Sequence, residues 1–189
     1  MFNLVFSRRF AMGHRLIASG SEKCATPHGH NETVTVRLQP VRPVPLDGQA
    51  NMTEPFERAK AIWHRWIDDH VDHAMQLSEA DPLLTWFMRQ EPQRLGRILV
   101  TPGDPTTEAL ACCMMAKLNA FLACDGGRLF CAEIRLEETP TNTVTFDGDP
   151  VAALAAIAGP DPWWRRPDMS INDIGGARER VGPIAAVAR

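Results

Sequence analysis

The chain has 189 residues, of which 44% are apolar and 23% are charged, and its net charge at pH 7 is −3. This is ordinary globular composition, and the length suits one domain with room for an appendage. A slightly acidic chain without a long basic run is not expected to bind nucleic acid as its main partner. The five cysteines do not indicate a disulfide framework, and no apolar run is long enough for a membrane span. We therefore expect a cytoplasmic protein without membrane association.

Two strands are predicted at the start of the chain. Apolar residues alternate with other residues over 2–13 and again over 30–39. His14 has the parity of the apolar residues in the first run, and His28 and His30 have that of the apolar residues in the second. If the loop 15–27 joins the two strands, all three imidazoles lie at one end of a single apolar sheet face.

This placement of His14, His28 and His30 predicts a metal site. Three neutral imidazoles with one position left open are typical of catalytic zinc, whereas structural zinc usually has four protein ligands. Cys24 is the alternative fourth ligand, because thiolate binds zinc well. It lies in a loop beside Lys23, where a free thiol can instead be ionised and reactive. The sequence favours a zinc enzyme.

The remaining elements are predicted from periodicity and from capping and turn residues. In chain order they are a proline-rich turn at 40–48, a helix from a capping Thr53 to about Val71, a long connection over 81–103 with a short helical turn at 83–88, a second helix from Asp104 to Gly126, a strand over 130–138 and a strand over 141–146. The order β-β-α-α-β-β predicts an α+β fold, an antiparallel sheet with two helices packed on one face. We expect one domain over 1–147, followed by a C-terminal extension over 148–189 whose character differs.

Several motifs carry a resemblance to a known family. In chain order they are Phe10-x-x-x-His14-Arg15-Leu16, Cys24-x-x-x-His28-Gly29-His30-Asn31, Val71-Asp72-His73, Pro105-Thr106-Thr107-Glu108 and Glu138-Thr139. Together they resemble the 6-pyruvoyl-tetrahydropterin synthase / 6-carboxy-tetrahydropterin synthase family. The resemblance implies the tunnelling fold, in which subunits close β-barrels around an axis. It also implies a homo-oligomer, commonly a hexamer, with active sites at subunit interfaces.

The resemblance also assigns roles to individual residues. The implied roles are zinc ligands for His14, His28 and His30, general base for Cys24, proton relay for Asp72 and His73, and carboxylate grip on the pterin ring for Glu138. A thiolate of lowered pKa can take a proton, and a histidine held by an aspartate can return one. A carboxylate at a strand end can accept two N–H bonds from the amidine edge of a pterin. Thr107 and Glu108 belong to a turn that the family places near the pterin, although the simpler interpretation is that they cap the second helix.

The spacing of the cysteine motif favours one reaction. Three residues separate Cys24 from His28, which resembles the bacterial 6-carboxy-tetrahydropterin synthases of the queuosine pathway. We therefore expect a zinc-dependent lyase that converts dihydroneopterin triphosphate to 6-carboxy-tetrahydropterin, releasing acetaldehyde and triphosphate. The alternatives are a pyruvoyl-forming lyase and a non-catalytic zinc or pterin-binding module of the same fold. Lys23 and Arg15 are the candidates for triphosphate binding. The connection 81–103 and the tail after Asp147 look longer than in typical members.

Overall fold

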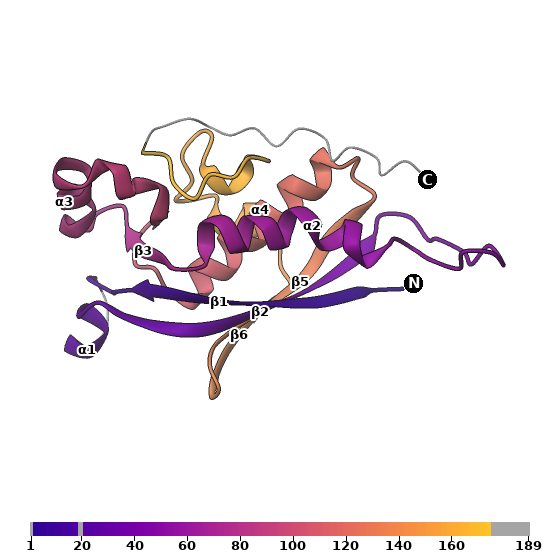
Figure 1. Ribbon diagram of the computed structural model, residues 1–189, viewed down its shortest axis with the longest axis horizontal. Coiled ribbons are helices and arrows are strands. Elements are labelled where there is room, and N and C mark those ends of the chain that lie inside the picture. Colours follow the sequence, from indigo (N-terminus) through magenta and orange to yellow (C-terminus); the bar gives the residue numbers. More distant parts are fainter. Residues whose placement is uncertain (1, 19–20, 175–189) are drawn as a thin grey trace.

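The computed structural model describes residues 2–18 and 21–174. Six strands form one sheet in the order β4-β3-β1-β2-β5-β6 (Figure 1). The strands are β1 (Leu4–His14), β2 (His28–Pro40), β3 (Ala74–Ser78), β4 (Ile98–Thr101), β5 (Leu129–Thr139) and β6 (Asn142–Phe146). The pairs β1–β2, β2–β5 and β5–β6 are antiparallel, whereas β3 is parallel to both β1 and β4. The sheet is therefore mixed.

Helices α2 and α4 lie on one side of this sheet (Figure 1). The helical elements are α1 (Glu22–Ala25), α2 (Phe56–Trp66), a π-helical turn (Ile67–Val71), α3 (Pro82–Gln90), a 3-10 helix (Pro92–Arg97), α4 (Thr107–Cys124), α5 (Pro150–Leu154) and a 3-10 turn (Trp163–Arg165). Helix α4 is apolar and long enough to cross a membrane by length and composition, but 56% of it is buried within the fold. It is the central helix of the core.

The α+β class is confirmed, and the four predicted strands occur in the predicted order along the chain. The prediction missed β3 and β4, which add a parallel edge to the antiparallel strands. Both are short, and their apolar residues Leu77, Ile98 and Leu99 are almost completely buried. A strand covered on both faces shows an apolar run and no alternation, so its period gives no signal. The prediction that Thr53 caps the first helix was also wrong, because α2 begins after Pro55 and has no side-chain cap bond.

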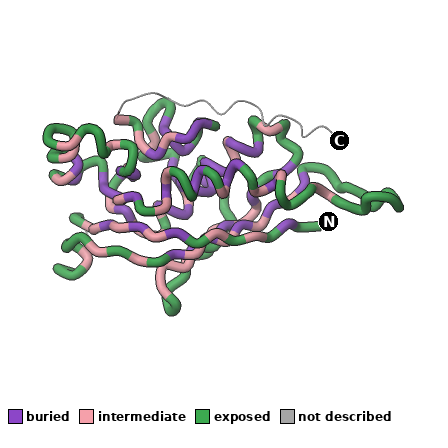
Figure 2. The backbone as a smooth tube through the Cα atoms, viewed as in Figure 1, coloured by how far each residue is buried: buried purple, intermediate pink, exposed green. Residues whose placement is uncertain are grey.

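The main core lies between the sheet and the two helices. Figure 2 shows buried residues concentrated where the strands face α2 and α4. On β2 the alternate residues Val34, Val36 and Leu38 are fully buried, as the period of two requires. Trp63 and Trp66 of α2 stack on each other over this face with ring centroids 5.3 Å apart. The alternation that predicted β2 therefore corresponds to a strand with one face buried in the core and the other face less buried.

The segment after β6 belongs to this core as far as residue 174. Its apolar residues Leu154, Trp163, Trp164, Met169 and Ile171 are buried in the main cluster. The segment is fixed by Lys117 of α4 and the three oxygen atoms that its ammonium contacts, a group called here the lysine anchor. Residues 175–189 of the predicted extension lie outside the described residues.

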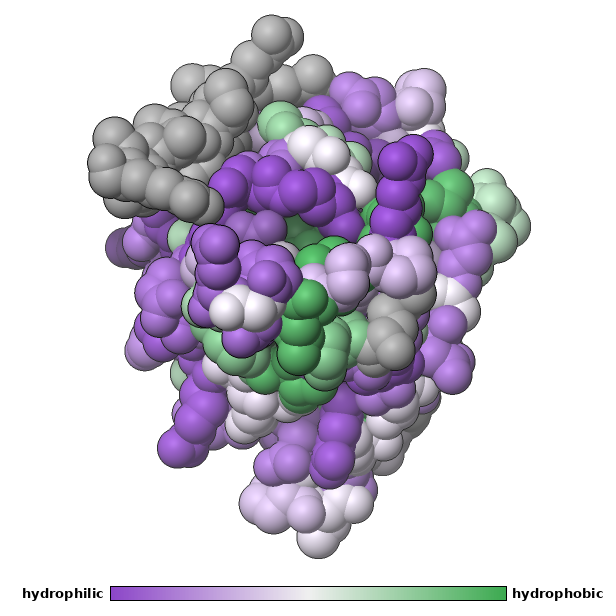
Figure 3. Space-filling view, turned by 90° about the vertical axis from the view of Figure 1, so that its right-hand side faces the viewer, coloured by the Kyte–Doolittle hydropathy of each residue, from purple (hydrophilic) through white to green (hydrophobic). Residues whose placement is uncertain are grey.

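An apolar area is exposed at the end of the molecule drawn at the right of Figure 1. Figure 3 looks onto this end and shows apolar residues ringed by hydrophilic ones. An open groove of about 420 Å³ lies between the start of the connection after β2 and the turn before β5, and Val41, Val44 and Leu129 line it. Val41 is 57% exposed. Contiguous exposed apolar areas of this kind commonly mark interaction surfaces.

Candidate metal and substrate site

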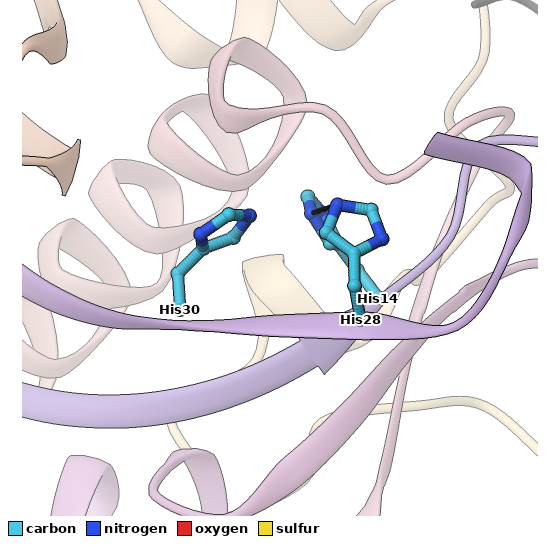
Figure 4. Close-up of side chains that lie close together, drawn as sticks. All are labelled: His14, His28 and His30. Atoms are coloured by element: carbon cyan, nitrogen blue, oxygen red, sulfur yellow. Dashed lines mark hydrogen bonds between the residues drawn. The ribbon is translucent and has the colours of Figure 1, made fainter. Parts of the chain in front are cut away.

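The β1–β2 hairpin brings the three predicted ligands together. Its register pairs His14 with His28 and Met12 with His30. The ligand atoms of the three histidines all lie within 4.8 Å of one another, and Figure 4 shows the rings turned toward a common point. Gly29 allows the close approach of the strands here, because a Cβ at this position would lie 2.9 Å from the carbonyl oxygen of Met12. We call this group the three-histidine cluster.

Backbone carbonyls fix the orientation of two of these rings. The Nδ1–H of His14 donates to the carbonyl oxygen of Pro105 at 3.0 Å, and the Nδ1–H of His28 donates to that of Thr26 at 2.8 Å. A carbonyl can only accept, so in both neutral rings the proton is on Nδ1 and the lone pair is on Nε2. The two Nε2 atoms nevertheless lie 3.1 Å apart. Two facing lone pairs repel each other, and a cation between them removes the repulsion.

The donor set therefore fits a metal ion. Outer hydrogen bonds from metal-bound histidines to backbone carbonyls are the usual way in which such rings are oriented. Burial lowers the pKa of His14, which favours the neutral form that binds metal. In the described residues this cluster contains histidines and no thiol or carboxylate. Three nitrogen ligands leave further coordination positions open for a substrate.

Cys24 lies in the short helix α1, close to the end of β1. Its carbonyl oxygen accepts a 2.8 Å hydrogen bond from the backbone N–H of Leu16, which ties the loop to the strand. Its Sγ accepts from the hydroxyl of Ser21 at 3.5 Å. The thiol is partly exposed. Its role as the general base stays a prediction.

Asp72 and His73 form the predicted pair. Nδ1 of His73 lies 2.9 Å from Oδ2 of Asp72, while Oδ1 of Asp72 accepts from the backbone N–H of Ala11 at 2.8 Å. Burial favours a higher pKa for Asp72, but the bonds from Ala11 and His73 outweigh it, so the pKa of this carboxyl is lowered. His73 has a φ of 62°, a conformation uncommon for residues other than glycine, and its N–H is fixed by a 2.7 Å bond to the carbonyl oxygen of Ala11. The side chain of His73 is 78% exposed.

A cleft of about 470 Å³ opens beside His14 and contains Glu138. Its walls come from the end of β1, the first turn of α4 and the β5–β6 hairpin. They are formed by His14, Leu16, Thr106, Thr107, Glu108, Glu138, Thr141, Asn142, Thr143 and Val144.

The start of α4 differs in detail from the predicted cap. The N-cap is Thr106, whose hydroxyl accepts from the N–H of Ala109 at 3.2 Å. Thr107 does not cap the helix, because its hydroxyl donates to Oε1 of Glu138 at 2.8 Å. Glu108 lies in the first turn, where a carboxylate is favoured by the helix dipole. The structure thus places Thr107, Glu108 and Glu138 around one opening.

Two buried polar residues of this region were not predicted as site residues. Gln76 is 1% exposed, lies next to His14 in the β1–β3 register, and its Nε2 has no hydrogen-bond partner. Glu32 is 4% exposed and its Oε2 has no partner. Burial, and then the charge of Glu138, raise the pKa of Glu32 to about 8. The sequence did contain a signal for Glu32, because a carboxylate interrupts the apolar face of β2 two residues after His30.

Comparisons with known proteins agree with this geometry. The family model described as 6-pyruvoyl tetrahydropterin synthase matches residues 3–149. No curated protein sequence matches the chain. Among solved structures, an uncharacterized protein of Wolinella succinogenes matches with a TM-score of 0.62 and 20% identity, covering 78% of this chain and 98% of that chain. The 6-pyruvoyl tetrahydropterin synthase of Caenorhabditis elegans has a TM-score of 0.53 and 22% identity over 78% and 95% of the two chains. At these identities the solved structures show only a shared fold. The family model matches most of the chain and therefore shows which family it belongs to. The chain belongs to the 6-pyruvoyl tetrahydropterin synthase family.

Proposed function

We propose that this protein is a zinc-dependent lyase that converts dihydroneopterin triphosphate and water to 6-carboxy-tetrahydropterin, acetaldehyde and triphosphate. Membership of the family supports a lyase of the tetrahydropterin-synthase type. The observation that carries the proposal is the convergence of three histidine ring nitrogens, two of the rings being in a fixed tautomer, in a cluster whose member His14 also lines the cleft that contains Glu138. The spacing of three residues between Cys24 and His28 favours the 6-carboxy product.

The three-histidine cluster would hold the zinc. Zinc bound there supplies Lewis acidity toward the hydroxyl oxygens of the pterin side chain. Cys24 is the base in this proposal. The hydrogen bond from Leu16 to its carbonyl oxygen ties it to the chain just after His14, and among the described residues its thiol is not part of the three-histidine cluster, which supports a thiol that is not a metal ligand. Asp72 orients His73, which carries the second proton transfer.

Glu138 is the proposed anchor of the pterin ring. A carboxylate accepts two parallel N–H bonds from the amino-pyrimidinone edge, and such charge-assisted pairs are stronger than neutral ones. The hydroxyl of Thr107 uses only part of the acceptor capacity of Oε1, so both oxygens of Glu138 can still receive ring donors. Thr107 and Glu108 complete this binding surface.

The complete site is proposed to form between subunits of a homo-oligomer, a hexamer. In the described residues no hydrogen bond or ion pair joins Asp72 or His73 to the three-histidine cluster, and the side chain of His73 is mostly exposed. A second copy of the chain can supply the relay pair to the cleft of the first. The apolar area shown in Figure 3 gives such an assembly a surface to bury. The cytoplasmic location stays a prediction.

Product analysis tests the reaction. The zinc-loaded protein is incubated with dihydroneopterin triphosphate, and the products are identified by mass spectrometry together with an assay for acetaldehyde. 6-Carboxy-tetrahydropterin with stoichiometric acetaldehyde is the expected result. A 6-pyruvoyl product without acetaldehyde would establish the alternative lyase, and an unchanged substrate that binds tightly would establish a binding module.

A further inference from the structure

Glu32 is a buried carboxyl group without a function in the proposed reaction. It lies on β2, on the same sheet face as His28 and His30, and 4% of the residue is exposed. Its neighbour on β1 is the buried Phe10, which offers no hydrogen bond. Oε2 of Glu32 has no partner. An unsatisfied buried polar group costs free energy, so its retention two residues from His30 needs a reason.

A second carboxylate lies beside Glu32. The antiparallel pairing of β2 with β5 ends at Thr33 and Glu137. One step further in this register brings Glu32 level with Glu138, on the face covered by α4. Two acidic groups this close disfavour each other's ionisation, and burial together with the charge of Glu138 raises the pKa of Glu32. Among the described residues no lysine or arginine contacts either carboxylate, so the compensating group has to come from a ligand.

The chemistry of two neighbouring carboxylates indicates a ligand edge with several N–H donors. Along one side, a 2-amino-4-oxo-7,8-dihydropteridine ring carries N3–H, the two hydrogens of the 2-amino group, the acceptor N1 and then N8–H. A single carboxylate accepts from N3 and one N2 hydrogen, which leaves the N8 end of the edge unpaired. Neighbouring strands are about 4.7–4.9 Å apart, so a carboxylate on the next strand reaches further along the same edge.

We propose that Glu32 is the second acidic side chain of the ring pocket and that its carboxyl oxygen accepts the N8–H of the reduced pterin. This inference rests on the proposed function. An oxidised pterin has no hydrogen on N8, and its N8 is an acceptor. The carboxylate pair therefore makes the pocket select the 7,8-dihydro ring over the oxidised ring, while Glu138 alone recognises the amino-pyrimidinone end that both rings share.

Binding of two pterins tests this selection. 7,8-Dihydrobiopterin and biopterin have the same side chain, and their affinities for the zinc-loaded full chain are measured anaerobically by calorimetry. The unmodified protein should prefer the dihydro ring by roughly 3-fold to 100-fold, the range from a neutral hydrogen bond to one with a charged group. Glu32→Leu should lose this preference, and Glu32→Gln, which keeps an acceptor oxygen, should keep part of it. Thermal unfolding of each variant reports whether it is folded.

Glu137→Leu is the matched control, because Glu137 is adjacent to Glu138 but its side chain is 42% exposed. It should keep the full preference. Equal affinity of the unmodified protein for both rings, or an unchanged preference in folded Glu32→Leu, would overturn the role of Glu32 and leave the proposed function standing. Failure of the unmodified protein to bind either ring would overturn the proposed function as well.

Discussion

Two polar clusters lie within this fold, and they differ in whether their hydrogen-bonding groups are satisfied. In the lysine anchor, the fully buried Nζ of Lys117 contacts the carbonyl oxygens of Trp163 and Arg166 at 3.0 and 2.9 Å and Oδ1 of Asp168 at 3.0 Å. An ammonium has three N–H groups, and each has an acceptor here. The cluster needs nothing from outside the chain.

At the end of the sheet near the cleft, by contrast, several buried hydrogen-bonding groups have no partner among the described residues. Of the four orphaned side-chain atoms in the described residues, two belong to Glu32 and Gln76, which flank the three-histidine cluster. Two histidine lone pairs also face each other there. Buried polar groups are nearly always paired in folded proteins, so a local concentration of unpaired ones indicates a missing partner. The lysine anchor is built to hold the chain, and the cleft is built to receive a ligand.

The largest effect should come from removing a metal ligand. His28→Ala and His30→Ala should each lose the bound zinc and all turnover, because two imidazoles cannot hold the ion as three do. Metal analysis of the purified variants measures this, with His64→Ala as the control histidine outside the cluster. Unchanged zinc in both variants would contradict the assignment, and a Zn–S distance of about 2.3 Å to Cys24 would establish the closed structural site instead.

Removing the base should spare the metal and remove the reaction. Cys24→Ala should keep zinc and the fold while losing about 10²–10⁴-fold in kcat, the range for a general base. Asp72→Asn should have a similar effect, since His73 loses the group that orients it. Steady-state kinetics with Cys112→Ala as the matched thiol control would measure this. Near-normal turnover of Cys24→Ala would exclude the thiol from the mechanism.

Breaking the lysine anchor should change stability and leave the metal site intact. Lys117→Met removes one of the two cations that contact the buried Asp168, the other being Arg166, and it leaves two buried carbonyls without their donor, so the free energy of unfolding should fall by about 3 kcal/mol. Lys60→Met, on a partly exposed face of α2, should change it by less than about 0.5 kcal/mol. Denaturant unfolding measures both, and zinc content per folded subunit should be unchanged. Loss of zinc in folded Lys117→Met would show that the two clusters are coupled.

The two clusters also differ in how well the sequence predicts them. The three-histidine cluster was predictable because the ligands lie on two strongly alternating strands, where parity fixes the face and the motif spacing fixes the end. The lysine anchor was not, because Lys117 lies in a helix and two of its acceptors are backbone carbonyls more than forty residues away. Carbonyl positions have no signature in the sequence. The strands β3 and β4 escaped prediction for a related reason, since burial on both faces removes the alternation.

A smaller effect is expected at the ring anchor. Glu138→Gln should weaken biopterin binding by about 1.5–3 kcal/mol, the range for hydrogen bonds to charged groups, with zinc still bound. Calorimetry measures the affinity, and Glu137→Gln on the opposite face should bind normally. Equal affinity in Glu138→Gln would show that the pterin ring does not bind to Glu138. The cleft could then no longer be contrasted with the lysine anchor as a ligand site.

The smallest effect should appear on acidification of the lysine anchor. Burial alone would raise the pKa of Asp168, but the hydroxyl of Ser170 and the ammonium of Lys117 lower it to about 2 from the ordinary 3.8. A carboxyl group whose pKa is lowered in the folded state adds stability that is complete above its unfolded pKa and is lost as the pH falls through the folded value. The unfolding free energy should therefore fall by about 2 kcal/mol between pH 4 and pH 2 because of this group. Asp168→Asn should be less stable at pH 7 and should lack this part of the acid dependence, which denaturant unfolding across the pH range would measure. The same dependence of stability on pH in the unmodified protein and in Asp168→Asn would show that the Asp168 carboxylate is not held as the structure indicates. The lysine anchor could then not be called a fully satisfied cluster, and only the unpaired groups near the cleft would support the contrast.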